Sequence, residues 1–160
     1  NAMKDREKVY KNTNLLLNTA KEFNIPVILS EQYPRGLGET VAVIKENLPE
    51  DYIYVEKQSF SLCGAGLSEI LAELGRKTVI VCGSETHVCV FQTARDLVEA
   101  GYNVHLVRDA VCSRFDENYE NSLSLMSELG AVVTNTETVV FDLLVAAGTK
   151  EFKAISPLIK

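Results

Sequence analysis

Short apolar segments rich in β-branched residues alternate along this chain with amphipathic segments of helical period. The expected strands begin near residues 27, 52, 78, 104 and 131, so each interval leaves room for one helix and two short loops. Repeated units of this kind form parallel sheets with right-handed crossovers and with helices on the sheet faces. The alternation therefore predicts an α/β fold with a parallel sheet, whose binding crevice lies at the carboxyl ends of the strands.

Glycine residues mark the ends of several expected helices. The segments 67–74, 88–100 and 123–129 each run into a glycine, the residue that most readily takes the left-handed conformation found after a helix. No linker or low-complexity tract interrupts the pattern, so we expect residues 1–160 to form a single domain. Further helices are expected over 9–23, 40–47, 139–147 and 151–160, and a loop over 31–38.

The charge and composition of the 160-residue chain exclude several classes of partner. The formal net charge is −6 and no basic run is present, whereas a nucleic-acid-binding domain usually has a basic patch. No apolar stretch approaches the ~20 residues that a membrane-spanning helix needs. No signal-peptide pattern opens the chain, so we expect a cytoplasmic protein. The four cysteines have no metal-type spacing and are expected to be free thiols, and no metal or cofactor is expected.

The segment 78–89, TVIVCGSETHVC, has the clearest chemical pattern. A strand pattern ends at Gly83, a turn follows, and Cys89 comes at the start of a helical segment. A thiol there lies at the positive end of the helix dipole beside unpaired backbone N–H groups, which favour the thiolate and can stabilise an oxyanion. Cys89 is therefore the candidate nucleophile, although a cysteine at a helix start is more often a small buried residue.

Lys57 follows the expected strand at 52–55 and reaches the same edge of the parallel sheet as Cys89. A cation there favours a neighbouring thiolate and steadies developing negative charge, although a lysine at a strand end is commonly only a solvated charge. Ser30 and Glu31 reach this edge after the strand at 27–29.

The remaining cysteines and histidines have simpler interpretations. His87, in the turn before Cys89, is expected to have a structural or lining role. Cys82 lies within a strand and is expected in the core. Cys63 and Cys112 are expected in loops, and Cys112 is a minor rival to Cys89 because it reaches the binding edge.

Four segments of the chain resemble one known family. GSETHVCVFQTARDLVEAGYNVHLVRDAVCSR is similar to the signature segment of the isochorismatase-like cysteine hydrolases, and EQYPRGLGET, VEKQSFS and EFKAISPLIK extend the resemblance across the printed chain. The resemblance is to the branch of isochorismatase domain-containing proteins. It implies a three-layer α/β/α sandwich of Rossmann-like type and a catalytic Asp–Lys–Cys triad.

The resemblance also assigns roles to residues of this chain. Cys89 matches the family's nucleophile, and Lys57, in the motif Glu-Lys-x-x-Phe-Ser, matches its lysine. The family has a non-proline cis peptide before the nucleophile, which falls on Ser84–Glu85 here. The oxyanion hole would then consist of the backbone N–H groups of Glu85 and Cys89.

The family's aspartate has no match in this sequence. It ends the first strand of the family's sheet, in an apolar segment followed by Asp-x-Gln, and no such segment is printed. Because that strand is central, its absence would leave unpaired edges on both neighbouring strands. We therefore expect an N-terminally incomplete domain. Three explanations stay open: residues missing from the printed chain, a native Ala2-Met3 with numbering that begins late, or a whole chain in which a partner subunit or a rearranged sheet fills the gap.

These features predict a metal-independent hydrolase that cleaves an amide-like or imide-like C–N bond of a small molecule through the Cys89 thiolate. Tyr33 and Phe60 are expected to line the substrate pocket, and Glu31 and Glu85 are remote candidates for a substitute base. Members of the family commonly assemble, so a homo-oligomer is expected.

The alternative is a catalytically inactive member that binds a metabolite or serves assembly. A further alternative is a redox-sensing thiol at Cys89, with Cys112 as its resolving partner.

Overall fold

Helices and strands alternate along the chain as the hydrophobic pattern predicts. The computed structural model describes residues 3–159. The predicted domain 1–160 and the predicted helix 151–160 include Asn1, Ala2 and Lys160, which lie outside the described residues.

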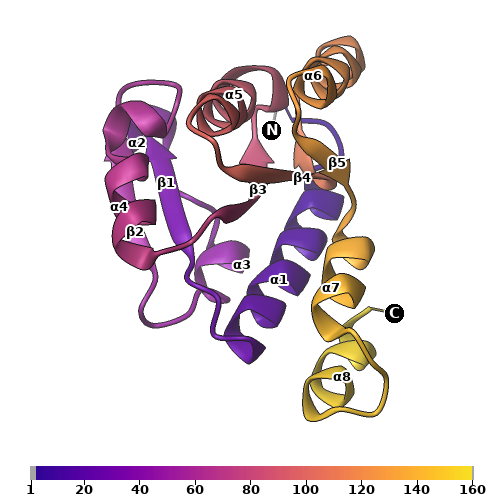
Figure 1. Ribbon diagram of the computed structural model, residues 1–160. Coiled ribbons are helices and arrows are strands. Elements are labelled where there is room, and N and C mark those ends of the chain that lie inside the picture. The colour runs from indigo at the N-terminus through magenta and orange to yellow at the C-terminus, as the bar shows by residue number, and fades with distance from the viewer. Residues whose placement is uncertain (1–2, 160) are drawn as a thin grey trace.

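The elements follow in the order shown in Figure 1. The helices are α1 (Arg6–Glu22), α2 (Pro34–Leu37), α3 (Ala42–Lys45), η1 (Cys63–Ala65), α4 (Leu67–Leu74), η2 (Thr86–Val90), α5 (Phe91–Glu99), α6 (Asp116–Glu128), α7 (Thr136–Leu144), α8 (Lys150–Ile155) and η3 (Ser156–Leu158). The strands are β1 (Ile28–Gln32), β2 (Ile53–Lys57), β3 (Thr78–Ser84), β4 (Asn103–Cys112) and β5 (Val132–Thr134).

All the strand pairs are parallel, as predicted, but the strands form two sheets. β1 pairs with β2, and β3, β4 and β5 form a second sheet in that order. Within residues 3–159, no strand pairs with the second edge of β1 or of β3. The sheets stay separate because a single sheet would need a strand that is hydrogen-bonded to both β1 and β3.

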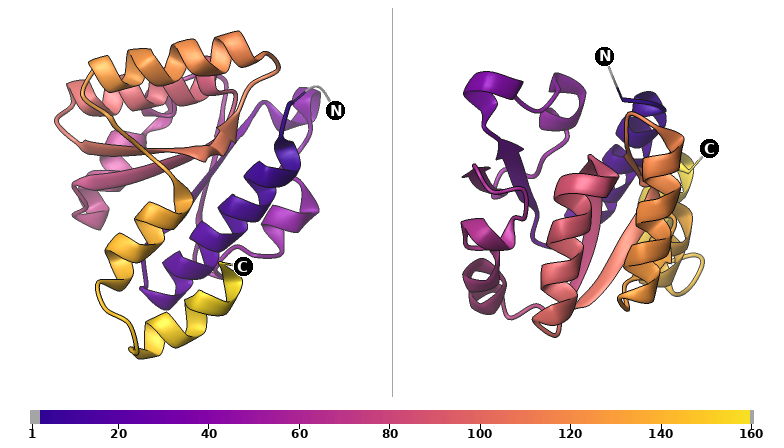
Figure 2. Two further views of the ribbon diagram at one scale, coloured as in Figure 1. Left: turned by 90° about the vertical axis from the view of Figure 1, so that its right-hand side faces the viewer. Right: turned by 90° about the horizontal axis from the view of Figure 1, so that it is seen from above.

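Helices cover both faces of the β3–β4–β5 sheet, so the predicted three-layer arrangement is confirmed (Figures 1 and 2). On one face, Leu106 of β4 packs in a cluster with Leu97 of α5 and Met126 of α6, and all three are fully buried. On the other face, the neighbouring Val107 packs with Val139 of α7. Successive strand residues point to opposite faces, and burying each such side chain contributes roughly 1.5–3 kcal/mol.

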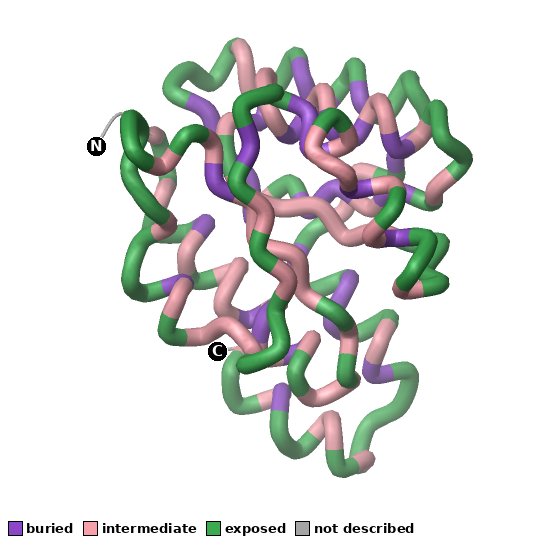
Figure 3. The backbone as a smooth tube through the Cα atoms, turned by 90° about the vertical axis from the view of Figure 1, so that its left-hand side faces the viewer, coloured by how far each residue is buried: buried purple, intermediate pink, exposed green. Residues whose placement is uncertain are grey.

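Burial follows the amphipathic pattern that predicted the helices. In Figure 3, buried positions recur at intervals along the helices, between exposed ones. The longest helix, α1, buries Val9, Leu15, Leu17 and Thr19 and leaves the rest of its surface partly or fully exposed. No helix among the described residues is long and apolar enough to cross a membrane.

Four strands end two or more residues later than their sequence patterns predict, among them β2 at Lys57 and β3 at Ser84. β1 continues through Ser30 and Glu31 to Gln32, and α2 forms within the predicted loop 31–38. β4 continues to Cys112, so this cysteine ends a strand and is buried, and the predicted loop position is wrong. β1 extends because its pairing with β2 continues through polar positions, with Gln32 opposite Lys57. The pairing of β4 with β3 is instead interrupted by a register shift and resumes with Val111 opposite Gly83 and Cys112 opposite Ser84.

Candidate active site

The segment between β3 and α5 is a tight turn that carries Cys89. Gly83 has a φ of 121°, a conformation that side chains other than hydrogen rarely allow. The peptide bond between Ser84 and Glu85, the pair to which the resemblance assigned a cis bond, is cis. The chain then forms the π-helical turn η2, in which the amide of Val90 donates to the carbonyl of Glu85, before α5 begins. Cys89 therefore lies in the π-helical turn, half-buried, rather than in the first turn of a regular α-helix.

Lys57 is the last residue of β2 and is not a solvated surface charge. Only 5% of the residue is exposed. Its Nζ donates to Gln32 Oε1 at 2.6 Å, and to the carbonyl oxygens of Phe60 at 2.8 Å and of Ser59 at 3.1 Å. An ammonium group has three N–H donors, so all of its hydrogen bonds are made to neutral oxygens of the protein.

Gln32 brings the lysine and the cysteine together. The oxygen that accepts from Lys57 also lies 3.9 Å from the Sγ of Cys89, so Gln32 at the end of β1 contacts the turn η2, which follows β3 of the other sheet. The Nε2 of Gln32 donates to the carbonyl of Gln58 at 2.7 Å, so the amide cannot rotate without losing that bond. The sequence analysis missed Gln32 because it placed this residue in a loop. Its place at the carboxyl end of the first strand was the signal that could have found it.

The Glu31 carboxylate is hydrogen-bonded to neighbouring groups of the fold. Its Oε1 accepts from the backbone N–H of Thr40 at 2.7 Å, its Oε2 accepts from the hydroxyl of Tyr54 at 3.0 Å, and Lys45 lies 3.4 Å away. Burial by itself would raise the pKa of Glu31, but the hydrogen bonds from Thr40 and Tyr54, together with Lys45, hold the pKa below its usual value. A low pKa and occupied oxygens make Glu31 a poor proton acceptor.

The Glu85 carboxylate is also paired, in this case with Arg114 of a neighbouring loop. Its Oε2 accepts from the backbone N–H of Arg114 at 3.2 Å and from the Nε of the same residue at 3.0 Å. The carboxylate therefore holds Arg114, and the structure does not favour the remote prediction that Glu85 acts as a substitute base.

His87 links the Cys89 turn to α6. Its Nδ1 lies 3.0 Å from the hydroxyl of Ser113, and its Nε2 lies 3.4 Å from the Nδ2 of Asn118. Both ring nitrogens therefore have partners away from Cys89, which agrees with the structural role expected for this histidine.

The other thiols lie in environments that oppose ionisation. Burial raises the pKa of Cys112 to about 11, with further contributions from the carboxylates of Glu85 and Asp5. Burial likewise raises the pKa of Cys82 and of Cys63. Since the thiolate is the reactive form, these three are poor nucleophiles, and Cys112 is a weak candidate for a resolving thiol.

The two aromatic residues expected to line the pocket are tied to Lys57 through their backbones. The amide of Tyr33 donates to the carbonyl of Lys57 at 3.0 Å, and the carbonyl of Phe60 accepts from the Lys57 Nζ. Their side chains are 47% and 52% exposed. They are therefore free to contact a ligand, and their lining role stays a prediction.

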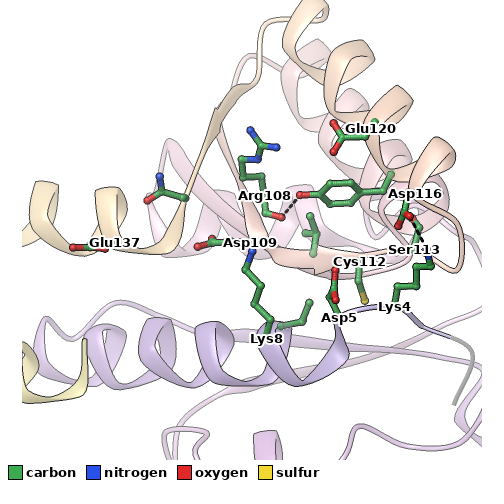
Figure 4. A pocket seen from close by; sticks show the side chains of 14 residues that line it. Lys4, Asp5, Lys8, Arg108, Asp109, Cys112, Ser113, Asp116, Glu120 and Glu137 are labelled. Carbon is green, nitrogen blue, oxygen red and sulfur yellow. Dashed lines mark hydrogen bonds and ion pairs between the residues drawn. The ribbon is translucent and has the colours of Figure 1, made fainter. Parts of the chain in front are cut away.

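A cavity of about 570 Å³ lies elsewhere, where the start of α1 faces the end of β4 (Figure 4). Side chains of both charges line it, including Lys8, Arg108 and Asp109, whereas Cys89 and Lys57 do not. Its walls are partly fixed by the hydroxyl of Tyr119, which donates to the carbonyl of Arg108 at 2.6 Å.

Within residues 3–159, no group of three or more His, Cys, Asp or Glu side chains is placed to hold a metal ion.

Comparison with known proteins identifies the class. The model of the isochorismatase domain matches residues 1–138. The chain is 41% identical over 156 residues to the secreted isochorismatase effector Isc1 of Phytophthora sojae, covering 95% of this chain and 74% of that protein. It is 38% identical over 146 residues to isochorismatase domain-containing protein 1 of Danio rerio, covering 91% of this chain but 51% of that protein.

Solved structures share the fold. A MAR1 ribonuclease structure from Caenorhabditis elegans superimposes with a TM-score of 0.93 at 36% identity, covering 98% of this chain and 81% of that one. The YcaC protein of Escherichia coli, described as an octameric hydrolase of unknown specificity, gives a TM-score of 0.88 at 25% identity, covering 96% of this chain and 76% of that one. The protein belongs to the isochorismatase family, and this membership supports a function of the hydrolase type.

Proposed function

We propose that this protein is a metal-independent cysteine hydrolase that cleaves an amide-like or imide-like C–N bond of a small molecule, in one domain that includes residues 3–159. The supporting observation is the shared contact of Gln32, whose amide oxygen touches both the ammonium of Lys57 and the thiol of Cys89. A buried cation and a half-buried thiol thereby lie on either side of one side chain, at the carboxyl ends of strands from two sheets.

In the proposed reaction, the Cys89 thiolate attacks the substrate carbonyl carbon. A carbon–sulfur bond forms and the carbonyl electrons move to oxygen, to which the backbone N–H groups of Glu85 and Cys89 would donate. Collapse of this adduct breaks the C–N bond, the leaving amine takes up a proton from solvent, and a thioester remains. Water then hydrolyses the thioester and releases the acid and the free thiol. Because Lys57 uses all three N–H groups within the protein, it acts through its charge.

The family resemblance assigns the role of accepting the Cys89 proton to an aspartate. Glu31 and Glu85 do not take its place, because both oxygens of Glu31 accept hydrogen bonds and the Oε2 of Glu85 is paired with Arg114. We therefore propose that an aspartate from a strand beside β1 and β3 completes the catalytic site, and that this chain alone forms the thiolate by losing its proton to solvent.

Selective alkylation tests the nucleophile. Iodoacetamide at pH 7, followed by intact-mass and peptide analysis, should modify Cys89 faster than it modifies glutathione, and Lys57→Ala should slow the reaction. Mass spectrometry of the acid and the amine or amide formed from a panel of small amides and imides would then report turnover, with Cys89→Ser as the control. A Cys89 that reacts no faster than glutathione, and is insensitive to Lys57→Ala, would favour the inactive, metabolite-binding alternative.

The ribonuclease described for the similar C. elegans structure suggests a competing assay. The net charge of −6 gives this chain no overall attraction to phosphates, so we expect no cleavage of single-stranded or double-stranded RNA. Cleavage that is lost in Cys89→Ser would replace the small-molecule proposal.

We also propose that the protein is a homo-oligomer and cytoplasmic. Oligomerisation is supported by the octameric state described for the YcaC structure and by exposed apolar side chains such as Phe141. Light scattering after size exclusion gives the mass directly, and a monomer at micromolar concentration would contradict the first proposal. The relative from P. sojae is named as secreted, so fractionation of cells that express the protein is the test of the second.

A further inference from the structure

We infer that Thr93 is a positioning residue: its hydroxyl holds the loop 58–66 on helix α5 and thereby fixes the Lys57 ammonium relative to Cys89. This loop, QSFSLCGAG, follows β2 and supplies two of the three hydrogen-bond acceptors of Lys57. The inference rests on the proposed Cys89–Lys57 site and adds to it the contact that sets where the lysine lies.

The position of the Lys57 ammonium depends on the backbone of this loop. Its Nζ donates to the carbonyl of Phe60 at 2.8 Å and to that of Ser59 at 3.1 Å, and only 5% of the residue is exposed. Because a lysine side chain is a flexible stem, these two carbonyls, together with the amide of Gln32, decide where the charge lies. A displacement of the loop would therefore move the ammonium as well.

Thr93 binds the loop to α5 from the helix side. The backbone N–H of Leu62 donates to the Oγ1 of Thr93 at 3.0 Å, and both residues are buried. Since a buried N–H without an acceptor is unfavourable, this bond gives the loop one preferred place on the helix. Thr93 follows Cys89 by four residues, in the helix that continues directly from the turn η2. The helix is therefore joined to the cysteine by its backbone and to the lysine loop by one hydroxyl.

A second contact holds the same loop further along α5. The side chain of Ser61 is hydrogen-bonded to Asp96, and the backbone N–H of Cys63 donates to the Oγ of Ser61 at 3.2 Å. Asp96 follows Thr93 by three residues, a spacing that places both side chains on one face of the helix. The turn η1 within the loop also packs against α5. These contacts are made between the loop and α5, so they are independent of the proposed aspartate.

Thr93→Val tests the inference, because valine has nearly the shape of threonine but offers no acceptor to the Leu62 N–H. We expect iodoacetamide alkylation of Cys89 at pH 7 to slow by about threefold or more, since an opposite charge within about 4–6 Å changes a pKa by about 1–3 units and a displaced lysine supplies less of this effect. The rate ratio of anionic iodoacetate to neutral iodoacetamide should fall too, because it reports positive charge near the sulfur. Thr93→Ser keeps the hydroxyl and should behave as wild type in both measurements.

A double-mutant cycle separates the positioning of Lys57 from a general effect on the Cys89 turn. In a Lys57→Ala background there is no ammonium to position, so Thr93→Val should change the alkylation rate by less than about twofold. Equal slowing with and without the lysine would overturn the inference, because Thr93 would then act on the turn through the fold of α5. Thr19→Val is the matched control and should change neither quantity, since Thr19 is buried in α1 and its hydroxyl donates to the Leu15 carbonyl of the same helix.

Two further variants complete the test. Ser61→Ala weakens the second contact of the loop and should lower the iodoacetate to iodoacetamide ratio in the same direction as Thr93→Val. Lys57→Ala separates this inference from the proposed function: if it slows alkylation and Thr93→Val does not, the proposed site stands and the role of Thr93 is refuted. If Lys57→Ala has no effect, the proposed site itself is wrong. Urea midpoints show whether each variant is folded, and if Thr93→Val is not, Ser61→Ala in the same cycle decides whether the contact of the loop with α5 positions the lysine.

Discussion

The substitution Glu31→Gln should destabilise the protein, and the cost should depend on pH. The wild-type carboxylate accepts two hydrogen bonds, from Thr40 and Tyr54, and lies beside Lys45. Glutamine can still accept from Thr40 and can donate to the Tyr54 hydroxyl, so the fold should survive. What is lost is the charge that strengthens these bonds.

The magnitude follows from the difference between charged and neutral hydrogen bonds. Bonds to charged groups contribute about 1.5–3 kcal/mol and neutral ones about 0.5–1.5 kcal/mol. Two bonds therefore lose roughly 2 kcal/mol in free energy of unfolding, which for a chain of this size is a fall of roughly 4–8 °C in Tm. Urea denaturation followed by circular dichroism at pH 7 measures this directly.

The pH dependence gives a second, independent check. Hydrogen bonds hold the folded-state pKa of Glu31 below its usual value, so its stabilisation is fully present above the usual carboxyl pKa of about 4.3. It is lost as pH falls through the lower folded-state value. The deficit of Glu31→Gln should therefore be full at pH 7 and should shrink below about pH 4.

Glu39→Gln is the matched control. Glu39 also pairs with Lys45, at 2.8 Å, but its side chain is exposed, and surface ion pairs contribute about 0–1 kcal/mol. A Glu31→Gln variant as stable as wild type at pH 7, or a deficit of equal size at pH 7 and pH 3.5, would refute the reasoning.

Three other expectations concern different parts of the fold. Native Cys112, whose pKa is raised to about 11, should resist iodoacetamide at pH 8 and react in urea; peptide mapping that finds it modified in the folded protein would contradict this. Val145→Gly should raise the free energy of unfolding by about 1 kcal/mol, because this valine has a φ of 59° and is 88% exposed; a loss in the urea midpoint would disprove it. Leu106→Ala should cost about 2–5 kcal/mol, because the side chain is fully buried in β4, and an unchanged midpoint would mean that the core repacks around it.

The sequence predicts the local structure of this protein well, because periodicity and turn chemistry are local properties. The helix at 67–74 ends before Gly75 in the structure, as its pattern requires. The parallel direction of the strands follows from the length of the segments between them. The same reasoning brings Lys57 and Cys89 to the carboxyl ends of their strands, and the Gln32 contact is compatible with both expectations.

Where the strands end was harder to predict. Apolar patterning stops at Leu29, yet β1 continues to Gln32 because β2 pairs with it. β4 reaches Cys112 differently, because its register with β3 shifts after Leu106 and pairing resumes with Val111 opposite Gly83 and Cys112 opposite Ser84. Backbone pairing is indifferent to side-chain polarity, so hydropathy alone underestimates strands whose polar ends enter a site.

Sequence by itself determined the order of the strands and of most helices, the family, and the two residues proposed for chemistry, but not the short helix α2 or the π-helical turn η2. Only the tertiary structure decided that the strands divide into two sheets, that Glu31 and Glu85 are engaged by other groups, and that Gln32 stands between Lys57 and Cys89. These are contacts between residues far apart in the chain, 25 positions for Gln32 with Lys57 and 57 for Gln32 with Cys89. They depend on how helices and strands pack, which local periodicity does not encode.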